Sequence, residues 1–431
     1  MRLNIVHPGA AELQYEIRDI VNFATKLEKV GLSITWENIG DPVSKGEEVP
    51  LWIREIIAKA AAADNTAYQY SPTKGLAKTR EFLAKKRSDE TGVELASDNI
   101  LFFNGLGDAI NKIYTWLNPS ARILGPNPAY PTHSSLEAAH GNSRMMTYKL
   151  DPRNNWYPDA NEVRVKVRAN PNIAGLLIIN PDNPTGMVYP RHVLQEFVKI
   201  AQEYELFLIS DEIYANMAFD ADNFVSIASL ADGVPTIIMR GLSKEVPWPG
   251  SRCGWVEFYN TESDDNFAQY AASIENAKMT EVCSTTLPQS VLPAILSDAR
   301  YRQHLASRLA KYQDRARQAV KILNENPALK VVMPAGAFYL SVVFSETFLD
   351  SPLNMPAANS KAQKLLDAEL ANIDEADFDK RFCYHLLAAT GICVVPLTTG
   401  FNSHVSGFRI TLLEPDEKIF IRTLQTIKAV I

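Results

Sequence analysis

The chain has 431 residues and a formal net charge of −7 at pH 7, with 46% hydrophobic and 22% charged residues. This length allows two domains with large buried cores, and the composition is that of an ordinary globular protein. The negative charge argues against nucleic-acid binding, which needs clustered lysine and arginine. The sequence has no run of about twenty apolar residues, so it predicts no membrane span. The first residues lack the apolar core of a signal peptide.

The cysteine and histidine patterns predict neither a disulfide framework nor a metal site. Cys253, Cys283, Cys383 and Cys393 are scattered, without a CxxC pair. The histidines also lie apart and lack paired-ligand spacing, so we assign them no role. A reduced, cytoplasmic protein without a metal is therefore expected.

Helical patterns occupy the N-terminal part of the chain, over residues 16–30, 50–63 and 74–92. Apolar runs then alternate with helical patterns, at 99–105, 121–131, 173–186, 206–214 and 235–244. Runs that are apolar on both faces are typical of strands buried in a parallel sheet, and intervening helices fit the crossover connections. The pattern predicts a large α/β domain over 51–300, with a mostly parallel sheet flanked by helices.

The C-terminal part of the chain has a different pattern of predicted elements. A charged helix is predicted over 300–327, followed by a hairpin or edge strands over 328–344. Residues 350–381 are rich in Pro, Ala and Asp and favour a mobile or accessory insertion. Further apolar strands and a terminal helix complete a smaller α+β domain over 301–431, against which residues 1–50 are expected to pack.

Polar or glycine-rich groups follow the predicted strands at the point where each strand ends. They are Gly105-Leu106-Gly107, Tyr130, the turn 180–186, Asp211 with Tyr214, and Lys244. Taken singly, each has a plain structural explanation as a turn, a helix cap or a surface residue. Because ligands bind at the carboxyl ends of parallel strands, the groups together predict one shared site.

Several motifs resemble those of the class I aminotransferases, which are pyridoxal-phosphate enzymes of fold type I. "NPDNPTG" is followed by "DEIY" and then by "GLSK", with Arg252 eight positions after Lys244. "NIGDP", "YSPTKGLAKTREFLA" and "GFRIT" resemble the family's N-terminal loop, tyrosine–glycine signature and C-terminal arginine strand. The resemblance implies the fold, pyridoxal 5'-phosphate as cofactor, and a cytoplasmic homodimer.

The resemblance also implies roles for individual residues. Lys244 would form the Schiff base with the cofactor and carry the proton during catalysis. Asp211 would pair with the pyridine nitrogen, Tyr214 and Asn183 would bind the phenolic oxygen, and Tyr130 would stack on the ring.

The remaining carried-over residues bind the phosphate and the substrate. Gly105, Leu106 and Gly107 would offer backbone N–H groups at a helix N-terminus, assisted by Ser243 and Arg252. Tyr70 would reach the phosphate from the neighbouring subunit. Arg409 would clamp the substrate carboxylate, with Asn183 beside it, and Gly40 and Phe338 would line the same pocket.

These residues are consistent with more than one function. The favoured hypothesis is ping-pong transamination between an α-amino acid and a 2-oxo acid. A carbon–sulfur lyase of the same fold, acting by β-elimination, would use the same lysine and aspartate, and a non-catalytic regulatory protein that binds the cofactor is a further alternative. A dinucleotide-binding enzyme is disfavoured because "NGLGDAI" lacks the third glycine. "VPLTTGF" at 395–401 departs from the family pattern, and the amino-acid side chain stays undetermined.

Overall fold

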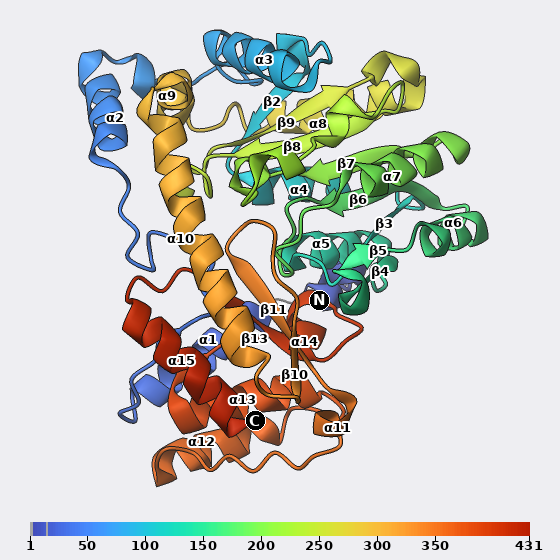
Figure 1. The fold of residues 1–431 in the computed structure, drawn as a ribbon. Coiled ribbons are helices and arrows are strands. Elements are labelled where there is room, and N and C mark those ends of the chain that lie inside the picture. The colour runs from blue at the N-terminus through green and yellow to red at the C-terminus, as the bar shows by residue number, and fades with distance from the viewer. Residues whose placement is uncertain (1–2, 14–15) are drawn as a thin grey trace.

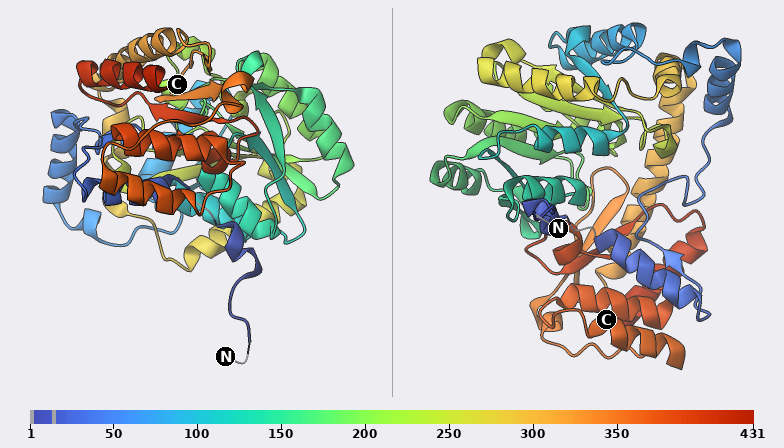
Figure 2. Two further views of the ribbon diagram at one scale, coloured as in Figure 1. Left: turned by 90° about the horizontal axis from the view of Figure 1, so that it is seen from below. Right: turned by 180° about the vertical axis from the view of Figure 1, so that it is seen from behind.

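The computed structural model describes residues 3–13 and 16–431. A large domain is built on a sheet whose strand order is β2-β9-β8-β7-β6-β3-β4-β5. The strands are β2 (Ile100–Phe103), β3 (Arg122–Asn127), β4 (Thr147–Asp151), β5 (Tyr157–Pro158), β6 (Ile173–Ile179), β7 (Phe207–Asp211), β8 (Thr236–Gly241) and β9 (Gly254–Tyr259). Helices flank this sheet, as Figures 1 and 2 show.

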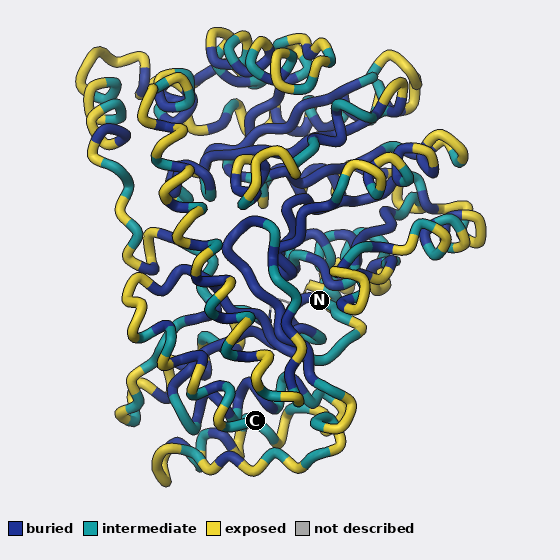
Figure 3. Tube along the Cα trace, viewed as in Figure 1, coloured by how far each residue is buried: buried dark blue, intermediate teal, exposed yellow. Residues whose placement is uncertain are grey.

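The helices of the large domain come before, between and after its strands in the chain. They are α2 (Leu51–Ala63), α3 (Ala77–Thr91), α4 (Leu106–Thr115), α5 (Pro131–Gly141), α6 (Ala160–Ala169), α7 (Arg191–Glu203), α8 (Asp265–Met279) and α9 (Thr286–Ser297). Nearly every residue of β6, β7 and β8 is buried, which explains why these strands read as continuous apolar runs. Figure 3 shows this buried sheet as a dark layer under more exposed helices.

Strand direction places the predicted site at one edge of the sheet. β3, β6, β7 and β8 run parallel, whereas β9 is antiparallel to both β8 and β2. Consequently β2 points the same way as β8, and the carboxyl ends of these five strands share one edge. The mostly parallel sheet expected from the sequence is confirmed, with β9 as an antiparallel insertion that the sequence pattern did not indicate.

A smaller domain contains an antiparallel sheet with the order β10-β11-β14-β13. Its strands are β10 (Leu329–Val331), β11 (Tyr339–Phe344), β13 (Val395–Pro396) and β14 (Gly407–Thr411), and a separate pair joins β1 (Thr35–Trp36) to β12 (Ile392–Cys393). The surrounding helices are α1 (Glu16–Glu28), α11 (Glu346–Leu349), α12 (Ser360–Leu370), α13 (Phe378–Thr390), α14 (Leu397–Phe401) and α15 (Glu417–Val430). The long helix α10 (Arg300–Leu323) extends from the large domain into the small one (Figure 1).

Two segments differ from the sequence-based expectation. Residues 350–381, expected as a mobile or accessory insertion, include helix α12, whose Ala362 and Leu366 are fully buried in the core of the small domain. The N-terminal segment is divided rather than packed wholly on the small domain. Its short helix Pro8–Glu12 contacts α5 of the large domain, and α1 contacts α12, α13 and α14.

Within the part of the chain that the structure describes, no helix is both long and apolar enough to cross a membrane.

Candidate active site

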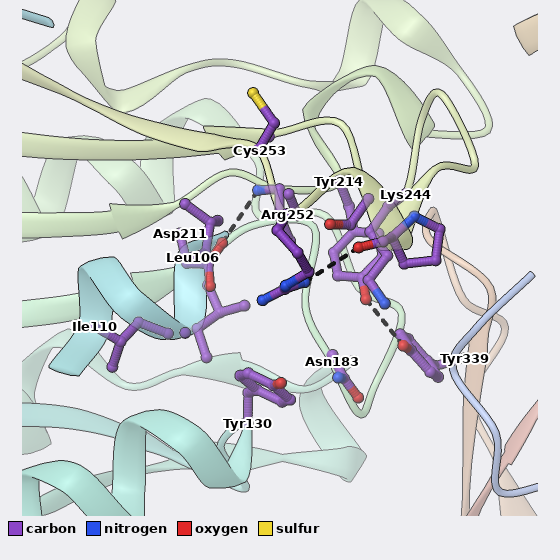
Figure 4. A pocket seen from close by; sticks show the side chains of 16 residues that line it. Leu106, Ile110, Tyr130, Asn183, Asp211, Tyr214, Lys244, Arg252, Cys253 and Tyr339 are labelled. Atoms are coloured by element: carbon purple, nitrogen blue, oxygen red, sulfur yellow. Dashed lines mark hydrogen bonds between the residues drawn. The ribbon is translucent and has the colours of Figure 1, made fainter. Parts of the chain in front are cut away.

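A pocket opens at the carboxyl edge of the large sheet and has an empty volume of about 840 Å³, part of it open to solvent. Its lining includes Leu106, Gly107, Tyr130, Asn183, Asp211, Tyr214, Ser243, Lys244, Arg252 and Tyr339 (Figure 4). The strand-end groups of the large domain therefore meet in one cavity, together with a tyrosine from the small domain.

One end of the pocket is suited to an anion. Helix α4 begins at Leu106, and the first N–H groups of a helix have no partner within it. Gly105 precedes this helix with a φ of +83°, and a Cβ there would collide with the Arg252 guanidinium. Arg252 donates to the carbonyls of Pro249 and Asn104, at 3.2 Å each. A cation and the positive end of a helix thus lie side by side.

Asp211 provides a buried carboxylate elsewhere in the same pocket. It is the last residue of β7, and its Oδ1 accepts a hydrogen bond from the Ile213 N–H at 3.1 Å. His133 Nε2, from α5, lies 3.2 Å from Asp211 Oδ2. Tyr114 Oη, from α4, lies 3.3 Å from His133 Nδ1. The carboxylate is therefore oriented by a chain of partners drawn from the flanking helices.

Lys244 enters the pocket from the loop after β8 and is half-buried. Its Nζ donates to the Gly40 carbonyl at 2.7 Å and lies 5.7 Å from the centroid of the Phe338 ring. Gly40 belongs to the N-terminal segment and Phe338 to the small domain. The amine is accordingly held where the two domains meet.

Two further groups connect this site to the small domain. Arg409, on β14, is 2% exposed, and its Nη1 donates to Asn183 Oδ1 at 3.3 Å. Its guanidinium lies 4.6 Å from the Tyr339 ring centroid and 5.0 Å from that of Phe401. Tyr214 Oη lies 2.9 Å from Tyr339 Oη (Figure 4). A cation that can bind a carboxylate thus contacts Asn183 and Tyr339, two residues that line the pocket.

Burial changes the pKa of several groups in or near the pocket. It raises the pKa of Tyr214 well above its ordinary value, and the neighbouring Tyr339 adds to this shift, so the Tyr214 hydroxyl keeps its proton. It raises the pKa of the Cys253 thiol to about 12, which keeps that thiol neutral. It also raises the pKa of Asp182 to about 7, although hydrogen bonds from Thr185 oppose the shift.

Not every residue implied by the resemblance lies in this pocket. Tyr70 is 81% exposed and lines a separate surface hollow with Asn104 and Ser251. Three residues contact the lining without being part of it. Gly40 and Phe338 contact Lys244, and Arg409 contacts Asn183 and Tyr339.

His133, Cys253 and Tyr339 belong to the site but were not selected from the sequence. Two of them carried a usable signal: His133 follows Tyr130 by one helical turn, and Tyr339 directly follows Phe338 in "GAFY".

Comparison with known proteins settles the family. Residues 38–419 match the family of class I and II aminotransferases. The chain belongs to this family. The aminotransferase is 47% identical, over 420 residues and 97% of its length, to an uncharacterized aminotransferase of Methanocaldococcus jannaschii, of which 96% is covered.

Better-described relatives are more distant. The glutamate-pyruvate aminotransferase of Escherichia coli is 28% identical over 328 residues, which cover 76% of this chain and 79% of the relative. The solved alanine aminotransferase of Pyrococcus furiosus is 27% identical and superposes with a TM-score of 0.84, covering 99% of both chains. The fold class and the aminotransferase activity expected from the sequence are confirmed.

The residues of the pocket fit pyridoxal phosphate, the cofactor of this family. The helix end beside Arg252 suits the phosphate, and a Cβ at Gly105 would displace the Arg252 guanidinium from this end of the pocket. Asp211 offers a buried carboxylate for the ring nitrogen, and Lys244 offers the amine. The anion site, the carboxylate and the amine line the same cavity, which suits a ring that contains a nitrogen atom and carries a phosphate and an aldehyde.

Proposed function

We propose that this aminotransferase moves an amino group between an α-amino acid and a 2-oxo acid in a ping-pong reaction, with pyridoxal phosphate attached to Lys244. One observation carries the proposal. Lys244 lines the same cavity as the buried carboxylate of Asp211 and the anion-binding helix end at Arg252. No other lysine is among the residues that line this cavity in the described ranges, 3–13 and 16–431.

When bound, pyridoxal phosphate supplies an electron sink for the charge left on the substrate α-carbon after its proton is removed. The protein's own residues would bind the cofactor and orient it. Arg252 and the first N–H groups of α4 would hold the phosphate, and Asp211, oriented by His133, would place its carboxylate beside the ring nitrogen. Tyr214 and Asn183 would hydrogen-bond the phenolic oxygen, and Tyr130 would pack on the ring.

Proton movement is assigned to Lys244 Nζ. Its partner, the Gly40 carbonyl at 2.7 Å, holds the amine at the domain junction, where Arg409 also lies. Arg409 clamps the substrate carboxylate through its two-pronged guanidinium, which would present the α-carbon to the amine. Since Gly40 and Phe338 come from outside the large domain, closure of the small domain completes the site.

The names of the relatives suggest the substrates. The Escherichia coli protein is a glutamate-pyruvate aminotransferase, and the Pyrococcus furiosus protein is an alanine aminotransferase. We propose alanine and glutamate as amino donors, with pyruvate and 2-oxoglutarate as the matching oxo acids. Among the described residues, the pocket lining holds no cation besides Lys244 and Arg252, which fits the small, uncharged side chain of alanine. The glutamate assignment rests on the name of the Escherichia coli relative.

We propose a homodimer because an aromatic and apolar surface of the chain is exposed. Tyr68, Tyr70, Met279 and Val282 are 67%, 81%, 51% and 49% exposed. Their segments lie together, because Thr73 Oγ1 donates to the Val282 carbonyl at 3.0 Å. A partner covering this surface would bring its own Tyr70 towards the anion-binding end of the pocket.

A reducing, cytoplasmic compartment is also proposed. Cys253, Cys283, Cys383 and Cys393 are all free thiols in the structure. Disulfides are rare in reducing compartments, and the absence of any among these cysteines fits that setting.

The experiment is a spectral panel on the purified, cofactor-loaded protein. Each amino acid is added in turn, and the visible band of the lysine-bound cofactor is followed. Alanine and glutamate should bleach the band, and pyruvate or 2-oxoglutarate should restore it. Release of ammonia without this reversal would instead indicate β-elimination. The Lys244→Ala variant should lack the band, and an unchanged spectrum in this variant would contradict the proposal.

A further inference from the structure

Tyr339 makes a contact on each side of the pocket. Its hydroxyl lies 2.9 Å from Tyr214 Oη, in the large domain. Its ring lies beneath Arg409, with 4.6 Å between the ring centroid and the guanidinium carbon. Figure 4 shows the Tyr214–Tyr339 hydrogen bond inside the cavity. One side chain therefore touches both the group assigned to the cofactor oxygen and the group assigned to the substrate carboxylate.

Packing fixes the position of this side chain. Tyr339 is 2% exposed, and a Cβ at Gly40 would collide with its hydroxyl, so the Gly40 loop closes tightly over it. The Tyr214 ring meets the Phe338 and Tyr339 rings edge-on, with centroids 5.5 Å and 5.7 Å away. The hydroxyl of Tyr339 accordingly has little freedom to leave Tyr214.

The count of protons decides the direction of the bond. Each tyrosine hydroxyl has one proton to donate, and burial keeps Tyr214 in its protonated form. If Tyr214 donates its proton into the pocket, the bond between the two hydroxyls needs Tyr339 as the donor. A hydroxyl that accepts one bond while donating another is also a stronger donor.

We propose that Tyr339 is a positioning residue that acts on both halves of the site. Its hydroxyl donates to Tyr214 and so directs the Tyr214 proton into the pocket, and its ring supports the Arg409 guanidinium from below. The first part rests on the proposed function, because it takes the phenolic oxygen of the cofactor as the acceptor for Tyr214. The second part concerns the arginine and the ring alone.

Two substitutions separate these parts. Tyr339→Phe removes the hydroxyl and keeps the ring, whereas Tyr339→Leu removes both. Tyr384→Phe is the matched control, because Tyr384 is a buried tyrosine of the small domain whose hydroxyl donates to Glu16, away from the pocket. The readouts are the pH at which the visible cofactor band titrates and the amino-acid concentration that half-saturates the spectral change.

In Tyr339→Phe the titration should move to higher pH by about 0.5–1 unit, because a weaker donor stabilises the anionic oxygen less. Half-saturation should stay within about twofold. Tyr339→Leu should show the same titration shift and a half-saturating concentration raised about tenfold, as expected for loss of a partly buried cation–aromatic contact. Tyr384→Phe should match the wild type in both.

Each part of the Tyr339 proposal is refuted by a different result. A wild-type titration in Tyr339→Phe refutes the hydroxyl's role, and wild-type half-saturation in Tyr339→Leu refutes the ring's role. If the wild type shows no cofactor band, the proposed function fails instead. The tyrosine pair is then tested in the cofactor-free protein, with a double-mutant cycle of Tyr214→Phe and Tyr339→Phe. Coupling of about twofold or more in the unfolding equilibrium constant supports the bond, and strict additivity refutes it.

Discussion

His133 orients Asp211: its Nε2 lies 3.2 Å from Asp211 Oδ2. The two residues come from different elements, since Asp211 ends strand β7 and His133 lies in the first turn of α5. Tyr114 contacts the opposite ring nitrogen at 3.3 Å, so the imidazole has a partner at each end. The carboxylate is thereby held in a fixed orientation at the pocket.

Replacing His133 by phenylalanine tests this arrangement while keeping an aromatic ring in place. A hydrogen bond to a charged group contributes about 1.5–3 kcal/mol, so its loss should lower kcat about tenfold or more. Steady-state kinetics with alanine measures the change. His192→Phe, at an exposed position on α7, is the control and should retain wild-type kcat. Equal rates in all three proteins would show that Asp211 needs no support from His133.

The anion-binding end is tested by Gly105→Ala. Gly105 has a φ of +83°, and a Cβ there would push the Arg252 guanidinium aside. The variant should bind pyridoxal phosphate at least about tenfold more weakly, as measured by equilibrium titration of the cofactor-free protein. Gly233→Ala is a matched control, because Gly233 has a φ of +70° and open space where a Cβ would project. It should lose stability from backbone strain and keep its cofactor affinity, whereas equal affinities in both variants would refute the assigned phosphate site.

Glu37 makes stability depend on pH. It is 1% exposed, its Oε1 lies 3.5 Å from Lys45 Nζ, and burial raises its pKa from an ordinary 4.5 to about 7. The folded protein therefore holds this proton more tightly than the unfolded chain. The stability gained in this way is complete below pH 4.5 and is lost as the pH rises to about 7.

Glu37→Gln should remove this dependence. Between pH 4.5 and 7.5 the wild type should lose on the order of 2 kcal/mol of unfolding free energy relative to the variant. Urea unfolding at several pH values measures the difference, with the exposed Glu262→Gln as the control. Parallel pH profiles for the wild type and Glu37→Gln would show that Glu37 does not titrate in this range.

The proposed dimer gives Tyr70 a role that one chain alone does not reveal. The protein should sediment as a dimer at micromolar concentration. Tyr70→Phe, which removes only the hydroxyl, should stay dimeric and bind the cofactor about threefold to tenfold more weakly. Tyr68→Phe, at its exposed neighbour, should leave the affinity unchanged. A fully active monomer would refute the interface.

The strand-end residues could be predicted from the sequence because their position follows from chain direction. Asp211 and Lys244 each come after an apolar strand, and parallel strands present their carboxyl ends at one edge. The glycine pair at 105 and 107 was recognisable for the same reason. Asp211, Lys244 and Gly107 do line one pocket in the structure, and Gly105 lies directly beside it against Arg252.

Other features depend on tertiary packing and were not predictable in this way. His133 and Tyr339 reach the site from a helix face and from another domain, so their spacing from Tyr130 and Phe338 is only a partial signal, and packing brings them to the site. Strand β9 is apolar like its neighbours, and its sequence does not encode that it runs antiparallel. The composition of residues 350–381 favoured an insertion, yet Ala362 and Leu366 lie at helical spacing and are buried.

The central claim is that Lys244 holds the cofactor, and reductive trapping tests it most directly. The loaded protein is treated with borohydride, digested, and its peptides are mapped by mass spectrometry. The peptide that contains Lys244 should carry the added mass of the reduced cofactor, at close to one equivalent per chain. Label on a different lysine, such as the buried Lys278, or no label on Lys244, would contradict the account.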